Sequence, residues 1–188
     1  MKKGFLSIVV LALAAMICCT GCKKKEDSLT KEDAVKYLTG AKHGWIATAA
    51  TCPAGYTMND LTVITDLLND GYFQQYEADN IMLFKSDNTV WLRPGKDKYV
   101  DEYSEEGEAY EMGNWSVSDD AKTLHFYFPT GYDPAFPEDS KTDASIVELT
   151  ENSLKVRFAF TISELDVKAA GTYTFVVTYR PAKASEDK

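Results

Sequence analysis

The strongest fold signal in this chain is the segment Leu154-Lys155-Val156-Arg157-Phe158-Ala159-Phe160, in which large apolar side chains alternate with polar or small ones. Successive side chains of an extended strand point to opposite faces, so a period of two predicts a half-buried β-strand. Two further segments alternate in the same way, and their expected inward-facing side chains are Tyr173, Phe175, Val177 and Tyr179 in one and Leu124, Phe126 and Phe128 in the other. The sequence therefore predicts strands that turn one face toward an apolar core.

Short turn sequences, such as Asp87-Asn88 and Glu151-Asn152, separate several of these segments. Eight strands are expected, at Trp45–Ala50, Asn80–Lys85, Thr89–Arg93, Tyr110–Val117, Thr123–Phe128, Ser145–Thr150, Leu154–Thr161 and Thr172–Arg180. Strands joined by tight turns pair antiparallel, and a meander of this size can close when its first strand pairs with its last. The predicted fold is all-β, an eight-stranded antiparallel up-and-down barrel with one or two short helices.

Two segments have helical spacing. Thr30 is suited to cap a helix that ends near Gly40, and the apolar face of this helix is expected to dock on one end of the barrel. Asp60–Leu68 places its leucines and Ile64 on one side, which predicts a second helix inside the long connection Thr51–Asp79. A long connection with its own apolar face is typical of a lid or a plug.

The first 22 residues have the layout of an export signal. Lys2 and Lys3 are followed by the apolar run Phe5–Ile17, which is too short to span a membrane stably, and then by small residues directly before Cys22. A cysteine after Thr-Gly resembles the lipobox of bacterial lipoproteins, which implies that Cys22 is acylated and becomes the first mature residue. The expected organisation is a signal peptide at 1–21, a lipidated tether at 22–28, the barrel domain at 29–182 and a flexible tail at 183–188.

Charge limits the class of partner. The chain of 188 residues carries a formal net charge of −9, and cleavage before Cys22 would remove two lysines and no acid, leaving 18 basic and 29 acidic residues and a charge of −11. Binding to nucleic acid or to anionic lipid requires clustered Lys and Arg, so neither is expected. Membrane attachment is instead expected through acyl chains on Cys22, with the folded domain monomeric.

The motifs of catalytic and metal sites are missing from the sequence. His43 and His125 lie in no metal-ligand spacing, and Cys52 would be the single thiol left in the folded domain, which excludes an internal disulfide and a cysteine-based zinc site. The acidic run from Asp97 to Glu111 lacks the order of a calcium loop and is typical of a solvated loop. We therefore expect no enzyme activity, no catalytic residue, no metal and no cofactor.

Aromatic residues are more numerous than a small core needs, with 11 Tyr, 9 Phe and 3 Trp. Trp45 and Trp115 are expected to plug the barrel, whereas Trp91 fits either a plug or a binding mouth. Rings near strand ends and in connections can stack on sugars or apolar ligands. The candidate ligand-binding residues are Tyr72, Phe73, Tyr76, Trp91, Tyr99, Tyr103, Tyr132 and Phe136.

The order of several short motifs resembles one known family, the small lipocalin-like lipoproteins of Bacteroidetes, over about residues 38–181. The motifs are Leu38-Thr39-Gly40 with Trp45, the hairpin Asn80–Thr89, Gly113-Asn114-Trp115-Ser116-Val117, Val147–Leu154 and Thr172–Arg180. Lys25-Glu26-Asp27 also resembles a surface-export signal found after the lipidated cysteine of such proteins. The resemblance implies an eight-stranded barrel with a possible pocket at one mouth, and no defined ligand.

The protein is expected in the cell envelope, anchored in the outer membrane, with exposure on the cell surface left open. Three function classes also remain open. The favoured one is noncatalytic binding of a small apolar or amphipathic molecule, or of a glycan fragment, at one mouth of the barrel. The alternative is a structural or interaction module whose filled barrel presents loops to another envelope protein, and hydrolysis is a third and weaker possibility. An interior cavity favours the first class, and a filled barrel favours the second.

Overall fold

The computed structural model describes residues 28–57, 62–70, 78–95, 109–129, 140–162 and 171–186, apart from the side chains at 160 and 162. Its elements are α1 (Lys31–Gly40), β1 (Trp45–Thr57), β2 (Val63–Asp66), β3 (Ile81–Phe84), β4 (Thr89–Arg93), β5 (Tyr110–Val117), β6 (Thr123–Phe128), β7 (Ser140–Leu149), β8 (Leu154–Ile162), β9 (Gly171–Pro181) and the 3-10 helix η1 (Ala184–Glu186). The predicted signal peptide and the tether through residue 27 lie outside the described residues.

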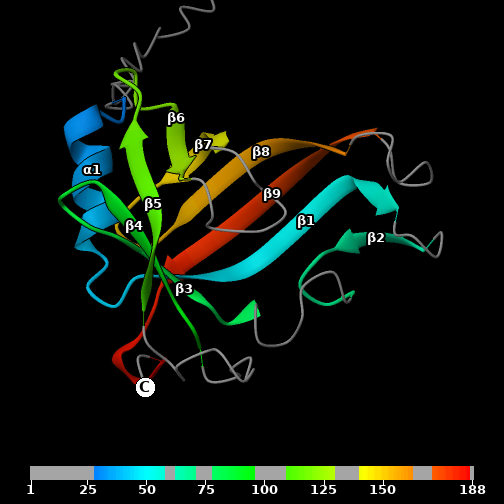
Figure 1. The fold of residues 1–188 in the computed structure, drawn as a ribbon, viewed down its shortest axis with the longest axis horizontal. Coiled ribbons are helices and arrows are strands. Elements are labelled where there is room, and N and C mark those ends of the chain that lie inside the picture. Colours follow the sequence, from blue (N-terminus) through cyan, green and yellow to red (C-terminus); the bar gives the residue numbers. More distant parts are fainter. Residues whose placement is uncertain are drawn as a thin grey trace, which may run out of the picture.

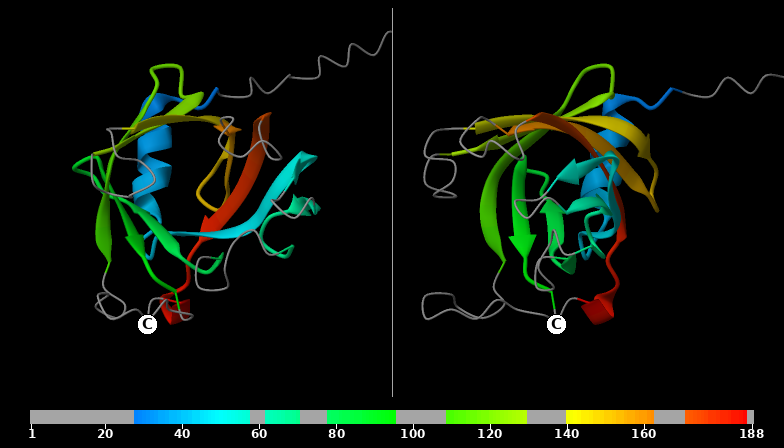
Figure 2. Two further views of the ribbon diagram at one scale, coloured as in Figure 1. Left: turned by 45° about the vertical axis from the view of Figure 1, so that its right-hand side comes forward. Right: turned by 90° about the vertical axis from the view of Figure 1, so that its right-hand side faces the viewer.

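The sheet is a closed antiparallel barrel. Each strand from β3 to β8 pairs with the next along the chain, β1 pairs with β3, and β1 also pairs with β9 to close the ring of eight. Figure 1 shows β1 and β9 side by side across the front, and Figure 2 shows the ring from two further directions. The predicted all-β, eight-stranded up-and-down barrel is confirmed.

The second predicted helix is wrong. Val63–Asp66, in the middle of the segment Asp60–Leu68, is the strand β2, which pairs with the outer half of β1. The run Thr62-Val63-Ile64-Thr65 is β-branched throughout, which favours an extended backbone over a helix. β1 itself continues to Thr57 rather than ending at Ala50, because β9 and then β2 supply its pairing partners.

Helix α1 closes one end of the barrel. Thr30 caps it by accepting a hydrogen bond from the Asp33 amide at 3.1 Å, as its sequence predicted. Ala34 and Leu38 are fully buried in the main core, and the Trp45 indole donates to the Leu38 carbonyl at 3.0 Å. Among the described residues, no helix has the length and apolar character needed to cross a membrane.

The two tryptophans expected as plugs do fill the barrel beneath α1. Trp45 has no exposed surface and Trp115 only 3%, and Trp115 packs edge-on against Phe84 with ring centres 5.1 Å apart. The Trp115 indole also donates to the Lys85 carbonyl at 3.2 Å, which satisfies its buried N–H. This end of the interior is therefore solid.

The C-terminal residues form a short strap instead of the flexible tail predicted at 183–188. Ala184–Glu186 is a 3-10 helix, and both oxygens of the Glu186 carboxylate accept from the Arg180 guanidinium at 2.6 and 2.9 Å. These bonds, with one from the Lys183 amide, lower the pKa of Glu186 to about 2. Residues 187 and 188 lie outside the described part of the chain.

Candidate binding site in the barrel interior

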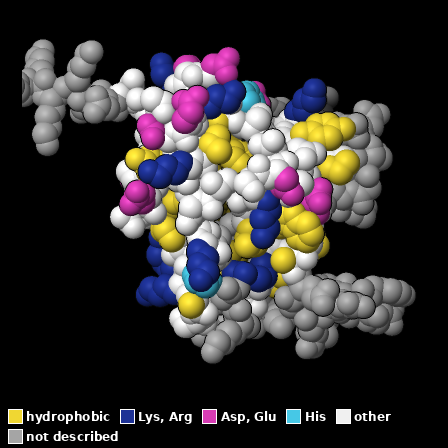
Figure 3. All heavy atoms as spheres, turned by 90° about the vertical axis from the view of Figure 1, so that its left-hand side faces the viewer, with side chains coloured by type: hydrophobic (Ala, Val, Ile, Leu, Met, Phe, Trp, Pro, Cys, Tyr) yellow, Lys and Arg dark blue, Asp and Glu magenta, His cyan; other side chains and the backbone are white. Residues whose placement is uncertain are grey.

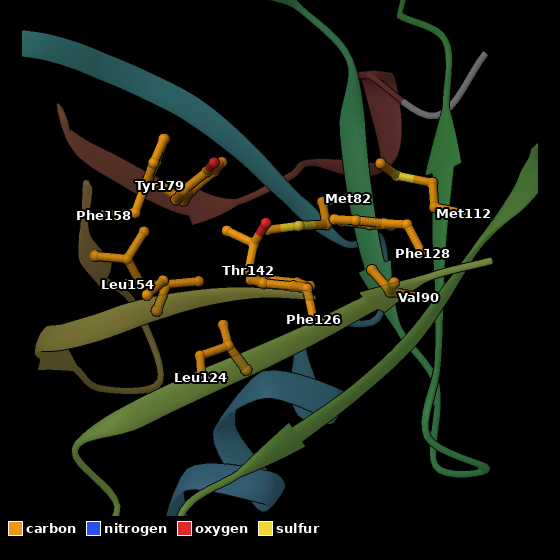
Figure 4. Close-up of a pocket in the computed structure, with 12 residues that line it drawn as sticks. Met82, Val90, Met112, Leu124, Phe126, Phe128, Thr142, Leu154, Phe158 and Tyr179 are labelled. Atoms are coloured by element: carbon orange, nitrogen blue, oxygen red, sulfur yellow. The ribbon is translucent and has the colours of Figure 1, made fainter. Parts of the chain in front are cut away.

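Beyond the tryptophan plug the barrel is hollow. A cavity of about 160 Å³ is lined by side chains from β3 to β9, of which ten are labelled in Figure 4: Met82, Val90, Met112, Leu124, Phe126, Phe128, Thr142, Leu154, Phe158 and Tyr179, with Ala144 and Val156 completing the wall. The barrel thus combines a filled end under α1 with an open space farther along its axis.

Strand alternation and register bring these side chains together. Leu124 pairs with Ala144 and Phe126 with Thr142 across β6 and β7, and Leu154 pairs with Tyr179 across β8 and β9. Paired residues point to the same face of a sheet, so each pair contributes a layer to the wall. The inward orientation predicted for β6 and β9, and for the described side chains of β8, is confirmed.

A bulge in β5 adds Met112 to this wall. Strict alternation from the buried Trp115 would turn Met112 outward, but the register between β4 and β5 shifts at Gly113. Gly113 has a φ of +155°, and a Cβ there would lie 2.1 Å from the Tyr127 carbonyl oxygen. The position therefore requires glycine, and the extra residue re-aims Met112 into the interior.

The size of the cavity limits what it can hold. Pockets for drug-sized ligands usually span about 300–1,000 Å³, whereas an apolar cavity of about 150 Å³ binds benzene. At about 160 Å³ this cavity is matched to a single small ring rather than to a long acyl chain. Met82 and Met112 are flexible thioether side chains that can adjust the shape of one wall.

The chemistry of the wall is almost wholly apolar. None of its twelve side chains is charged, and Thr142 and Tyr179 carry the two hydroxyls. Burial raises the pKa of Tyr179 to about 12, so its hydroxyl stays neutral. The site can therefore exclude water and hold an apolar body, and these residues supply no ligands for a metal ion.

Stacked and tilted rings stiffen the wall. Phe126 and Phe128 stack with centres 5.9 Å apart and planes 7° from parallel, and Phe158 lies 5.6 Å from Phe175. Farther along β9, Tyr173 meets Tyr56 of β1 edge-on at 4.8 Å. Tyr56 was missed from the sequence because β1 was expected to end before it.

The structure places the predicted site residue Trp91 on the outside of the barrel. Its neighbour Val90 lines the cavity, so Trp91 points the other way and packs beside Ile81 and Leu83 in a smaller outer cluster. Its indole donates to the Thr89 hydroxyl at 2.9 Å. Trp91 therefore neither plugs the barrel nor lines the cavity.

The other predicted ligand-binding residues fall in segments outside the described residues: Tyr72, Phe73, Tyr76, Tyr99, Tyr103, Tyr132 and Phe136. These segments join strands at the end of the barrel opposite to the short turns at Asp87-Asn88 and Glu151-Asn152. Their proposed role as a mouth stays a prediction. Cys22 likewise lies outside the described part.

On the outer face of β5, β6 and β7, one row of described residues resembles a catalytic arrangement. Ser116, His125 and Asp143 are aligned across the three strands, and His125 Nδ1 lies 2.7 Å from an Asp143 carboxylate oxygen. No hydrogen bond joins Ser116 to His125 within this part of the structure, so the contact that would activate a nucleophile is missing. His125 points outward, as predicted.

The described residues form no metal site, and the visible surface has no strongly charged patch. Within the described ranges, no three His, Cys, Asp or Glu side chains are grouped so that they could hold a metal ion. On the side of the molecule where α1 lies, basic and acidic side chains alternate with separate apolar patches (Figure 3). Cys52 is fully buried and is not in the cavity wall.

No protein-family model matches the chain, and no curated protein matches it in sequence. The resemblance to lipocalin-like lipoproteins therefore stays a prediction.

Proposed function

We propose that this protein is a lipid-anchored cell-envelope protein whose barrel binds a small apolar or amphipathic molecule without transforming it. The cavity of about 160 Å³ in the barrel interior is the observation that supports binding. Acylation of Cys22 would hold the domain at the membrane, and the outer membrane is the proposed location. The support for the anchor is the sequence Thr20-Gly21-Cys22 after a short apolar run.

The wall favours an apolar ligand over a glycan fragment. A sugar presents many hydroxyls, and burying them without hydrogen bonds costs about 1–3 kcal/mol each by protein mutational measures. The described wall offers two hydroxyl groups against ten apolar side chains. A compact hydrocarbon or aromatic ring, in contrast, gains about 25 cal/mol for each Å² of apolar surface removed from water.

Benzene is the probe that tests this function. The protein is labelled with ¹³C at its methionine methyl groups and titrated with benzene while methyl NMR spectra are recorded. Met82 and Met112 line the cavity, so a benzene ring beside them should shift their signals in a saturable manner.

Ala144→Leu is the matched control variant because it places a larger side chain in the same cavity. In this variant the benzene-dependent shifts of Met82 and Met112 should be lost while the protein remains folded. Shifts of equal size in both proteins would mean that benzene binds elsewhere. If benzene shifts neither methionine in the unsubstituted protein, the cavity is not a binding site and the interaction module becomes the better account.

A further inference from the structure

We infer that the ligand of this cavity is a neutral ring compound with a single hydrogen-bonding group, which the Tyr179 hydroxyl binds. Such a ligand requires the cavity to be a binding site, as proposed above. The inference adds the polarity of the ligand and names the residue that selects it. Two observations support it: none of the described side chains in the wall is charged, and no hydrogen bond joins the Tyr179 hydroxyl to another described residue.

Among its described residues, the wall contains no group that would neutralise an ionised ligand. Its twelve side chains include no Lys, Arg or His and no Asp or Glu. Moving an unpaired carboxylate or ammonium group out of water costs several kcal/mol even after the protein relaxes. A fatty acid or another small carboxylate would therefore be rejected in its charged form, whereas a neutral analogue would not.

Tyr179 lies on β9, opposite Leu154 of β8 and Ala47 of β1, so its ring extends into the barrel from the wall. Its pKa is raised by burial alone, with no hydrogen bond to any described residue contributing to the shift. Figure 4 shows Tyr179 beside Phe158 at one edge of the lining side chains, with Thr142 nearer the middle of the set. Tyr179 is partly buried, and no hydrogen bond joins its hydroxyl to another described residue, so a ligand in the cavity is free to accept a hydrogen bond from it.

The two hydroxyls do not have the same reach. The Tyr179 oxygen is at the end of a rigid ring, far from its own backbone, whereas Thr142 carries its hydroxyl on the Cβ, close to the β7 backbone. The tyrosine oxygen therefore has the longer reach from its strand. This difference assigns the polar contact to Tyr179 and leaves Thr142 as part of the side wall.

Toluene and phenol form the probe pair because they share a ring and differ in a methyl against a hydroxyl group. Dissociation constants are measured by the methionine-methyl titration for the unsubstituted protein and for Tyr179→Phe. Loss of one hydrogen bond should reduce the preference for phenol over toluene by about fivefold to tenfold. Benzoate, which is charged at neutral pH, should produce no saturable shift in either protein.

Two further variants control the assignment. Tyr110→Phe removes a hydroxyl from a tyrosine that is 45% exposed, and it should leave the preference for phenol unchanged. Thr142→Val removes the second hydroxyl of the wall at nearly constant volume. A preference that is lost in Thr142→Val and kept in Tyr179→Phe would overturn the assignment to Tyr179.

The outcomes separate this inference from the proposed function. Toluene binding with no effect of Tyr179→Phe on the phenol preference would refute the role of Tyr179 and leave the binding function intact. Benzoate binding as tight as phenol would refute the selection against charge. Failure of toluene, phenol and benzene alike would refute the binding function itself.

Discussion

Replacing Ala144 by leucine should stabilise this protein, although most substitutions of buried residues destabilise the proteins that carry them. Ala144 is 2% exposed and its side chain borders the cavity, so the added atoms enter empty space. Ala50 offers a matched comparison. It is 1% exposed and belongs to the same core, but it lines no part of the cavity.

The magnitudes follow from the number of carbon atoms added. Leucine carries three more carbons than alanine, and at about 0.8 kcal/mol for each buried methylene they contribute about 2.4 kcal/mol. Ordering the leucine side chain costs about 0.5–1 kcal/mol, so the net stabilisation by Ala144→Leu should be about 1.5–2 kcal/mol. Ala50→Leu should instead destabilise by about 1–3 kcal/mol, because extra methylenes in a packed core force strained rotamers.

Urea unfolding of both variants measures the difference. The free energies of unfolding should differ by about 2.5–5 kcal/mol, and at an m value of about 2 kcal/mol per molar urea the two midpoints should lie about 1.2–2.5 M apart. The comparison requires equal m values, which show that the denatured states are alike. If both substitutions lower the midpoint by the same amount, the interior at Ala144 is as full as at Ala50 and the cavity argument fails.

Two further predictions concern the ends of the chain. Glu186→Gln should lower the free energy of unfolding at neutral pH and have little effect in strong acid. The pKa of Glu186 is about 2 in the folded protein, against an ordinary value of 4.5. The ionised carboxylate therefore stabilises the fold fully above pH 4.5, and this stabilisation is lost as the pH falls toward 2. Urea midpoints of both proteins across this range measure it, and a difference that does not change with pH would exclude an ionic origin. Cys22→Ser should abolish incorporation of a fatty-acid analogue and leave the protein in the periplasm or as uncleaved precursor, as followed by metabolic labelling. Undiminished label on the Cys22→Ser protein would place the lipid elsewhere.

The barrel was predictable because each of its signals is local. Strict alternation in Leu154–Phe160 specifies which face of β8 points inward, and the short turns make each strand pair with the next. Thr30 and Gly40 mark the two ends of α1 in the same local way. The locally preferred structure is kept in the folded protein because tertiary contacts favour the same structure.

The errors arose where a local signal had two interpretations. Leu61, Ile64, Leu67 and Leu68 fit the spacing of a helix, yet the strand β2 forms because β1 continues beyond the barrel and offers an edge to pair with. The sequence was consistent with Trp91 either inside the barrel or at a binding mouth. Because its neighbour Val90 lines the cavity, alternation along β4 places the Trp91 side chain on the outer face. Each outcome depended on a partner that is distant in the sequence.

The sequence by itself determined the closed barrel, the capped helix and the set of inward-facing side chains, because strand period, turns and caps act between neighbouring residues. Only the tertiary structure decided that these side chains leave a space of about 160 Å³ instead of filling the barrel. That space is the difference between the volume that the closed sheet encloses and the summed volume of side chains from β3 to β9. The bulge at Gly113 and the packing of Trp45 and Trp115 both change how much of the interior is filled. No local sequence pattern encodes the enclosed volume or the summed side-chain volume.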